Sequence, residues 1–231
     1  MTRSALIVAH GQPSDPEPPE AEMAEMAREV ARKLPGWRIG SATLAAPESL
    51  KLALQSLENP LIFPFFMADG WFIRTLLPRR LAEAGAPEAR VLTPFGLLPE
   101  TADLAVAVLA GALAARGWRP DETTLVLAAH GSGRSPHPAA AARALQAAIS
   151  AHLAFAGCRL GFIEEAPELV EVAENAGPRA LCLPLFVARW GHVEDDIPAA
   201  LHAAGFQGAT LPPLGTDGRA ARLIARAIAA A

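Results

Sequence analysis

The sequence predicts an α/β fold of two similar halves, each a four-stranded parallel sheet flanked by helices. This is the flavodoxin- or Rossmann-type architecture, here with a cleft between the halves. The first observation behind this is an internal repeat. Ala9-His10-Gly11 returns 120 positions later as Ala129-His130-Gly131, and further anchors recur at the same spacing. The second is an alternation of short apolar runs with longer helical stretches, which is typical of parallel sheets with helical crossovers.

Apolar runs place the strands. Ala5–Ala9 and Thr124–Ala129 are short and lack polar alternation, as strands buried on both faces of a parallel sheet do. A short fourth strand is expected at the end of each half. The second and third strands are expected at 38–44 and 61–66, and at 159–163 and 180–187.

Helices fill the intervals between the strands. Glu20–Leu34 and Ala139–Phe155 carry apolar side chains at helical spacing. A further helix is expected after Pro47 and after Pro167, with the proline in its first turn. A third helix in each half is expected to end at a glycine, which is Gly85 in the first half and Gly205 in the second. A last helix, at 102–115 in the first half and 218–230 in the second, is expected to close each half.

A Gly-Pro-Asp segment separates the halves. It lies at 117–122 and predicts an N-terminal half over 1–118 and a C-terminal half over 119–231. The net charge of −4 and the pI near 5.9 argue against a nucleic-acid-binding protein.

Two cysteines without CxxC spacing indicate small buried side chains in a reducing compartment. The N-terminal apolar run is too short for a signal peptide, and no stretch approaches the ~20 apolar residues of a membrane helix. We therefore expect a cytoplasmic protein with no membrane partner.

Three side chains of the second half follow the ends of its main strands. His130 ends the first strand, Glu164 and Glu165 follow the second, and His192 follows the third. Ligands bind beyond the carboxyl ends of parallel strands, and neighbouring strands lie only ~4.8 Å apart. Imidazole and carboxylate ligands suit Co, Fe, Ni or Zn better than Mg or Ca. The sequence therefore predicts a metal site here. The alternative interpretation of His192, considered without the other two residues, is that it only shapes the turn before two aspartates that favour a helix N-terminus.

The corresponding places in the first half hold His10, then Leu44 with Ala45, then Phe72. One imidazole without partners is not a metal site, so one working site is expected, in the second half. Two interpretations of Phe72 stay open: core packing, or a wall for a flat ligand.

The glycine-rich segment after His130 reads Gly131-Ser132-Gly133-Arg134-Ser135. It is interpreted either as a tight turn and helix cap or as an anion cradle in which Ser132 and Arg134 hold a carboxylate or phosphate. It lacks the GK[ST] of a nucleotide-binding loop and the GxSxG of a nucleophile elbow. No nucleotide cofactor is expected.

Three motifs together carry a family resemblance. These are a strand ending in Ala-His-Gly-Ser, the acidic pair at 164–165, and the stretch Pro-Leu-Phe-Val-Ala-Arg-Trp-Gly-His-Val-Glu-Asp-Asp-Ile-Pro. The chain resembles the CbiX/SirB family of class II chelatases over its whole length, as a long, two-half member. The resemblance implies a chelatase-like fold and ATP-independent insertion of Co²⁺ or Fe²⁺ into sirohydrochlorin or a related tetrapyrrole, in cobalamin or siroheme biosynthesis. It also implies metal-binding or proton-accepting roles for His130 and His192, with Glu164 or Glu165 assisting.

The residues fit that chemistry. Metal insertion needs a loosely held ion and a base for two pyrrole N–H protons, and neutral histidine can serve in either role. The metal, Co²⁺, Fe²⁺ or Ni²⁺, is expected as a substrate. Arg134 and Arg189 are candidates to bind the carboxylates of the tetrapyrrole. Trp190 and Phe72 are candidates to pack on its faces, and His10 to touch it from the first half.

Two alternatives stay open. One is a hydrolase or phosphatase that uses His130 with Ser132, although no catalytic-triad order is evident. The other is a non-catalytic carrier of a tetrapyrrole or a metal ion. The sequence does not predict the oligomeric state.

Overall fold

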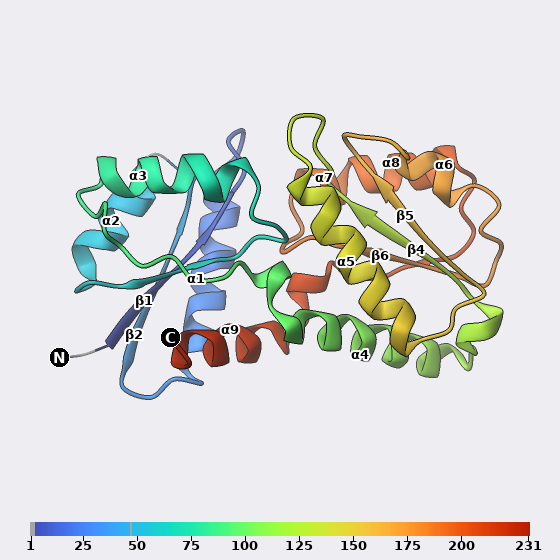
Figure 1. Ribbon diagram of the computed structural model, residues 1–231, viewed down its shortest axis with the longest axis horizontal. Helices are drawn as coiled ribbons and strands as arrows, with labels where there is room; N and C mark the ends of the chain where they lie inside the picture. The colour runs from blue at the N-terminus through green and yellow to red at the C-terminus, as the bar shows by residue number, and fades with distance from the viewer. Residues whose placement is uncertain (1–2, 47) are drawn as a thin grey trace. The chain divides into compact units, whose positions relative to one another are not determined.

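The chain folds as an α/β protein with two parallel sheets, which confirms the predicted fold class (Figure 1). The structure is a computed structural model that describes residues 3–46 and 48–231. Its contacts form two compact units: unit 1 runs to residue 98 and includes 218–231, and unit 2 comprises 99–217.

Unit 1 has a three-stranded sheet in the order β2-β1-β3. Its strands are β1 (Arg3–Ala9), β2 (Trp37–Thr43) and β3 (Leu61–Pro64). The prediction of four strands was wrong for this half, because a single bridge between Ile62 and Val91 stands in place of the fourth strand. Pro94 follows soon after and has no N–H to donate to a ladder.

The helices of unit 1 lie in two layers. α1 packs against α9, and α2 packs against α3. α1 begins before the predicted Glu20 because Pro18 and Pro19 are tolerated in a first turn, where a proline has no hydrogen bond to lose. Pro47, predicted in the first turn of α2, lies outside the described residues. The helices are α1 (Glu17–Ala31), α2 (Ser49–Ser56), the π-helix η1 (Phe72–Leu76), α3 (Leu77–Glu83), the 3₁₀ turn η2 (Phe95–Leu97) and α9 (Ala220–Ala229).

Unit 2 has a four-stranded sheet in the order β5-β4-β6-β7, as predicted. α4 packs against α5, and α6 against α8 (Figure 1). Pro167 lies before Glu168, the N-cap of α6, and not in its first turn as predicted. The strands are β4 (Thr124–Ala129), β5 (Gly157–Phe162), β6 (Ala180–Pro184) and β7 (Ala209–Thr210). The helices are α4 (Pro99–Arg116), α5 (His137–His152), α6 (Leu169–Ala173), α7 (Gly191–Glu194) and α8 (Asp196–Ala203), with 3₁₀ turns η3 (Pro120–Glu122) and η4 (Leu214–Thr216).

The compact units differ from the predicted halves in their closing helices. α4 closes the predicted half 1–118 but belongs to unit 2, while α9 closes 119–231 but belongs to unit 1, where it packs on α1 and β3. The division into 1–118 and 119–231, and the cleft between the halves, stay predictions.

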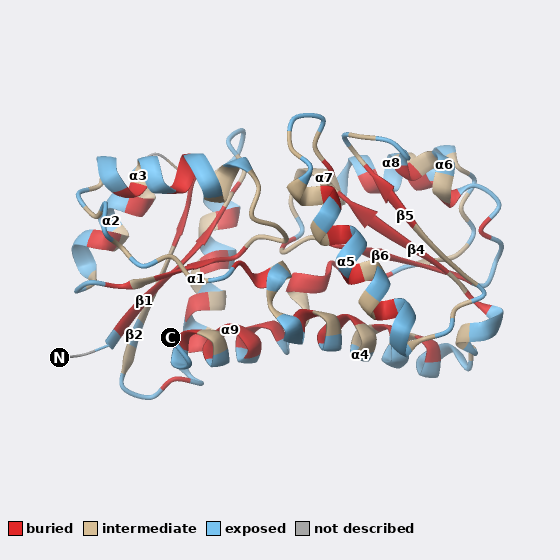
Figure 2. Ribbon diagram, viewed as in Figure 1, coloured by how far each residue is buried: buried red, intermediate tan, exposed pale blue. Residues whose placement is uncertain are grey.

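The central strands form the cores of the two units (Figure 2). Ala5–Ala9 of β1 are fully buried, and Leu125–Ala129 of β4 nearly so. Each strand is therefore covered on both faces, as its unbroken apolar run predicted. A tightly packed strand holds its carboxyl end in a fixed place, which matters because His10 and His130 come next in the chain.

None of the helices that the structure describes is long and apolar enough to span a membrane.

Candidate metal centre

The turn after β4 places His130. Gly131 has φ +73°, a left-handed conformation that glycine adopts without strain. A Cβ at Gly131 would lie 2.8 Å from the Cγ of Glu165 and 3.0 Å from the Cβ of Phe162, so a side chain has no room there. The chain reverses directly after His130, and Nδ1 of the imidazole lies 2.9 Å from the carbonyl oxygen of Gly131.

The end of β5 brings a carboxylate beside His130. The N–H of Glu164 donates to the carbonyl of His130 at 2.9 Å, which continues the strand pairing one step beyond the sheet. Oε1 of Glu164 lies 3.7 Å from Nε2 of His130. Glu165 lies instead under the turn against Gly131, and its Oε1 is buried with no hydrogen-bond partner among the described residues. Of the two acidic candidates, the geometry places Glu164 beside the histidines.

The short helix α7 places the third group, His192. Its Nε2 lies 3.1 Å from Nε2 of His130. One ligand atom from each of His130, Glu164 and His192 can be chosen so that all three lie within 4.8 Å of one another. Donor atoms ~2.1 Å from a tetrahedral ion are roughly 3.4 Å apart, so the separations of 3.1 and 3.7 Å from Nε2 of His130 are compatible with ligands of one ion.

Hydrogen bonds at Nδ1 determine which ring nitrogens can bind a metal. Nδ1 of His130 faces the carbonyl of Gly131, and Nδ1 of His192 lies 2.6 Å from Oδ2 of Asp196. A carbonyl and a carboxylate only accept, so in each neutral ring the hydrogen lies on Nδ1 and a lone pair on Nε2. The two lone pairs face each other, and a positive charge between them would relieve their repulsion.

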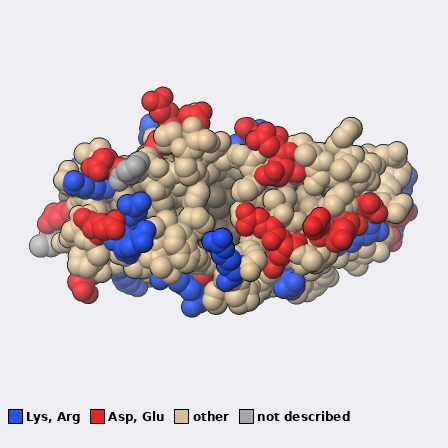
Figure 3. All heavy atoms as spheres, turned by 90° about the horizontal axis from the view of Figure 1, so that it is seen from above, with Lys and Arg blue, Asp and Glu red and all other residues tan. Residues whose placement is uncertain are grey.

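These three groups are accessible to solvent. The side chains of His130, Glu164 and His192 are 40%, 51% and 43% exposed. Figure 3 shows several groups of acidic side chains on this face of unit 2, and others on unit 1. Glu194 and Asp195, beside His192 in sequence, are exposed. Such a surface attracts divalent cations and repels a polycarboxylate.

Two exposed arginines supply local positive charge. Arg134 and Arg189 form no ion pair with any residue that the structure describes. The backbone N–H of Arg134 donates to Oγ of Ser132 at 3.2 Å, which gives Ser132 a role in shaping the turn. Trp190 is half-buried and forms the N-cap of α7, directly before Gly191 and His192.

The corresponding place in unit 1 has the same ring arrangement without the ligands. His10 meets Phe72 edge to face at 4.3 Å, and Nδ1 of His10 lies 2.7 Å from the carbonyl of Gly11. Phe72 packs against the apolar cluster of unit 1, which supports the core-packing interpretation, whereas the neighbouring Trp71 is 52% exposed. Leu44 is buried. Among the described residues, the one cluster able to hold a metal is that of unit 2.

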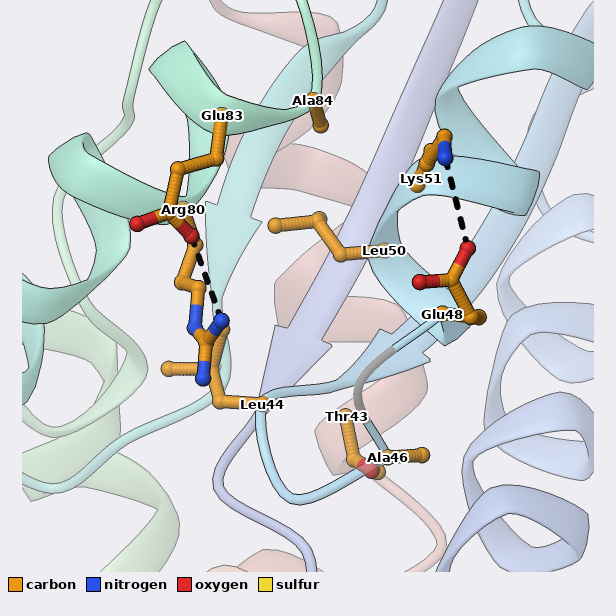
Figure 4. A pocket seen from close by; sticks show the side chains of 9 residues that line it. All are labelled: Thr43, Leu44, Ala46, Glu48, Leu50, Lys51, Arg80, Glu83 and Ala84. Atoms are coloured by element: carbon orange, nitrogen blue, oxygen red, sulfur yellow. Dashed lines mark hydrogen bonds and ion pairs between the residues drawn. The ribbon is translucent and has the colours of Figure 1, made fainter.

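A separate cavity of about 160 Å³ opens in unit 1 between α2 and α3 (Figure 4). Its charged side chains pair with each other: Arg80 with Glu83 at 3.2 Å, and Lys51 with Glu48 at 3.5 Å. None of the predicted site residues lines it. We assign it no part in the chemistry.

Sequence reasoning missed the contact of Asp196 with His192, having assigned this aspartate only to a helix N-terminus. The spacing of four residues is a signal for such a contact only within one helix, whereas the structure places His192 in α7 and Asp196 at the start of α8.

Comparisons with known proteins show the family and the fold. The sequence model of the CbiX family matches residues 124–231. The chain is similar to a solved structure described as CbiX, the terminal enzyme for biosynthesis of siroheme in denitrifying bacteria. The two are 47% identical with a TM-score of 0.92, over 99% of both chains. No curated protein matches significantly.

Two more distant structures share the fold. SirB from Bacillus subtilis with Fe³⁺ is 11% identical with a TM-score of 0.77, over 99% of this chain and 95% of that one. The sirohydrochlorin chelatase SirB from Bacillus subtilis subspecies spizizenii, in complex with cobalt, is 12% identical with a TM-score of 0.72, over 99% and 94%.

Proposed function

The chain belongs to the CbiX family, and from that premise we propose that it inserts a divalent metal ion into sirohydrochlorin or a related tetrapyrrole without a nucleotide. The observation that carries this proposal is the cluster of two imidazole nitrogens and one carboxylate at the strand ends of unit 2. His130, His192 and Glu164 are the proposed catalytic and metal-binding residues. His10 lacks such partners and is not one of them.

The ligand set suits an ion that must be released again. Two neutral imidazoles and one carboxylate leave coordination positions open for water and for pyrrole nitrogens. Only one ligand is anionic, so the ion is held less tightly than by a carboxylate cluster. Its exposure allows the macrocycle to approach from solvent.

The same groups can accept the displaced protons. A metal-free macrocycle loses two N–H protons as the divalent metal enters, so the overall charge balances. When the ion leaves, the lone pairs on Nε2 of His130 and His192 become free to take protons. Water or Glu164 then carries them to solvent.

Unit 2 also offers contacts for the rest of the tetrapyrrole. We propose that Arg134 and Arg189 bind its carboxylates, with Ser132 in the same turn. Trp190 is proposed to lie against the ring system.

Fe²⁺ is our first choice of metal because the 47% identical relative is described as an enzyme of siroheme biosynthesis, and siroheme contains iron. Co²⁺ is the second choice, since a SirB structure holds cobalt, and would connect the reaction to cobalamin biosynthesis. Ni²⁺ also suits imidazole ligands.

The test is an anaerobic assay without ATP. The protein is mixed with sirohydrochlorin and Fe²⁺, Co²⁺ or Ni²⁺, and insertion is followed by the change in the macrocycle's absorption spectrum. The expected result is a rate above the uncatalysed one that is lost in His130→Ala. His202→Ala, an exposed histidine on α8, is the control. Binding of metal and macrocycle without faster insertion would indicate a carrier and overturn the proposal.

A further inference from the structure

Asp196 contacts one of the proposed metal ligands without belonging to the ligand cluster itself. Its Oδ2 lies 2.6 Å from Nδ1 of His192, a short distance typical of a charge-assisted hydrogen bond. The two residues come from different helices. His192 is the second residue of α7, and Asp196 is the first residue of α8. The contact therefore ties the ligand to the helix that follows it.

This contact selects the tautomer of His192. Free histidine prefers the hydrogen on Nε2, and that tautomer would turn an N–H toward His130 and block the metal. A carboxylate at Nδ1 keeps the hydrogen there and leaves the lone pair on Nε2. His130 achieves the same with the backbone carbonyl of Gly131, which no substitution at that residue removes.

We propose that Asp196 is the positioning residue of the metal site: it holds His192 as the Nδ1–H tautomer, with Nε2 directed at the ion. Partners of this kind typically change metal affinity by 10–100-fold. The proposal rests on the proposed function, in that His192 must be a ligand. The corresponding residue of unit 1 is Leu76, which lies where no metal cluster is found among the described residues.

A simpler role for Asp196 is possible on the same helix. A carboxylate in the first turn also stabilises a helix through the dipole, and Asp195 lies at the N-cap of α8. Asp195 is exposed and forms no hydrogen bond or ion pair with His192 in the structure, so Asp195→Ala is the matched control. It removes the same charge from the same helix end without touching the ligand.

The experiment has two readouts. Long-range ¹H–¹⁵N NMR of the metal-free protein gives the tautomer of each histidine, with His192 assigned from His192→Ala. Titration with Co²⁺ gives the metal Kd. In Asp196→Ala we expect His192 to shift to the Nε2–H tautomer and the Kd to rise 10–100-fold. Asp196→Asn retains an oxygen acceptor, so its Co²⁺ Kd should lie between those of Asp196→Ala and the wild type. The Co²⁺ Kd of Asp195→Ala should stay within about twofold of the wild-type Kd.

Two outcomes would overturn the proposal. One is that Asp196→Ala keeps the Nδ1–H tautomer and binds Co²⁺ as the wild type does. The other is that Asp195→Ala loses as much affinity as Asp196→Ala, which would assign the effect to the helix end. A wild type that binds neither Co²⁺ nor Fe²⁺ would refute the proposed function, and with it any role of Asp196 at a metal site. The tautomer spectra would then show only whether Asp196 holds the hydrogen of His192 on Nδ1.

Discussion

His10 and Phe72 of unit 1 meet edge to face, with ring centroids 4.3 Å apart and an interplanar angle of 78°. His130 and His192 of unit 2 meet in the same way, at 4.5 Å and 89°. A phenyl ring and an imidazole thus occupy equivalent positions against a histidine. The packing at this place therefore does not require a nitrogen in the second ring, which is consistent with the proposed role of His192 as a ligand.

The first prediction exchanges that ring. His192→Phe should keep the folded structure, because unit 1 accommodates phenylalanine in the same arrangement, but should remove metal binding and insertion. Thermal unfolding and Co²⁺ titration measure the two effects. His192→Ala is the companion variant, with equal loss of metal binding and less ring packing. Retention of tight Co²⁺ binding in His192→Phe would show that His192 is not a ligand.

The reverse exchange should build only a weak site. Phe72→His restores a second imidazole beside His10, but Leu44 provides no carboxylate and Leu76 provides no partner for Nδ1. We expect a second Co²⁺ to bind at least tenfold more weakly than the first. Titration should be biphasic in Phe72→His and monophasic in the wild type. Two equal sites in the variant would mean that the carboxylate contributes nothing.

The third prediction compares the two repeat histidines. His130→Ala should reduce the insertion rate and the metal affinity by 10–100-fold or more, whereas His10→Ala should reduce both much less. The reason is that a ligand's contribution depends on partners that share the ion, and His10 has Phe72 where His130 has His192. Insertion rate and bound metal per chain are the measurements. Equal losses, or two equivalent metals in the wild type, would refute a single site.

The fourth prediction concerns the turn that carries His130. Gly131→Ala forces a side chain into a left-handed conformation and against Glu165, so it should destabilise the protein by about 1–3 kcal/mol. Gly133→Ala in the same turn is the control, since its Cβ would come no closer than 3.9 Å to Glu164 O. Denaturant unfolding of both variants is the test. Similar stabilities for the two would contradict the steric argument.

The fifth prediction is a pH dependence of stability. Burial raises the pKa of the Cys182 thiol from 9.0 to about 12. Above pH 9 the unfolded chain therefore loses this proton while the native protein keeps it. Stability should fall as pH rises from 9 toward 12, by up to ~1.4 kcal/mol per pH unit. The chain has no tyrosine, and Lys33 and Lys51 are its only lysines, so few other groups titrate there.

Cys182→Ala should flatten that dependence, and Cys158→Ala should leave it in place. Urea unfolding at pH 8, 9 and 10 measures the slopes. Ellman's reagent provides a second check, since buried Cys182 should react only after denaturation. Cys158 is half-buried rather than buried as predicted, and is the thiol within reach in the native protein. Equal slopes in both variants would exclude Cys182 as the cause.

The sequence by itself determined the fold class and the location of the proposed metal ligands. Unbroken apolar runs are the pattern of strands covered on both faces, so β1 and β4 could be predicted nearly to the residue. Because parallel strands end at one edge, the order of residues along the chain was enough to predict that His130, one of the two glutamates at 164–165 and His192 would come together. No pairwise contact had to be known for that.

Only the tertiary structure decided between Glu164 and Glu165, because neighbouring residues point to opposite sides and the choice depends on what lies under the turn at Gly131. The same holds for the hydrogen bond of Asp196, which spans the break between α7 and α8. It also holds for α4 and α9, since the sequence of a closing helix shows which face is apolar but not which sheet it covers. These features depend on contacts between segments distant in the chain, or on the path of a turn, and local sequence patterns carry neither.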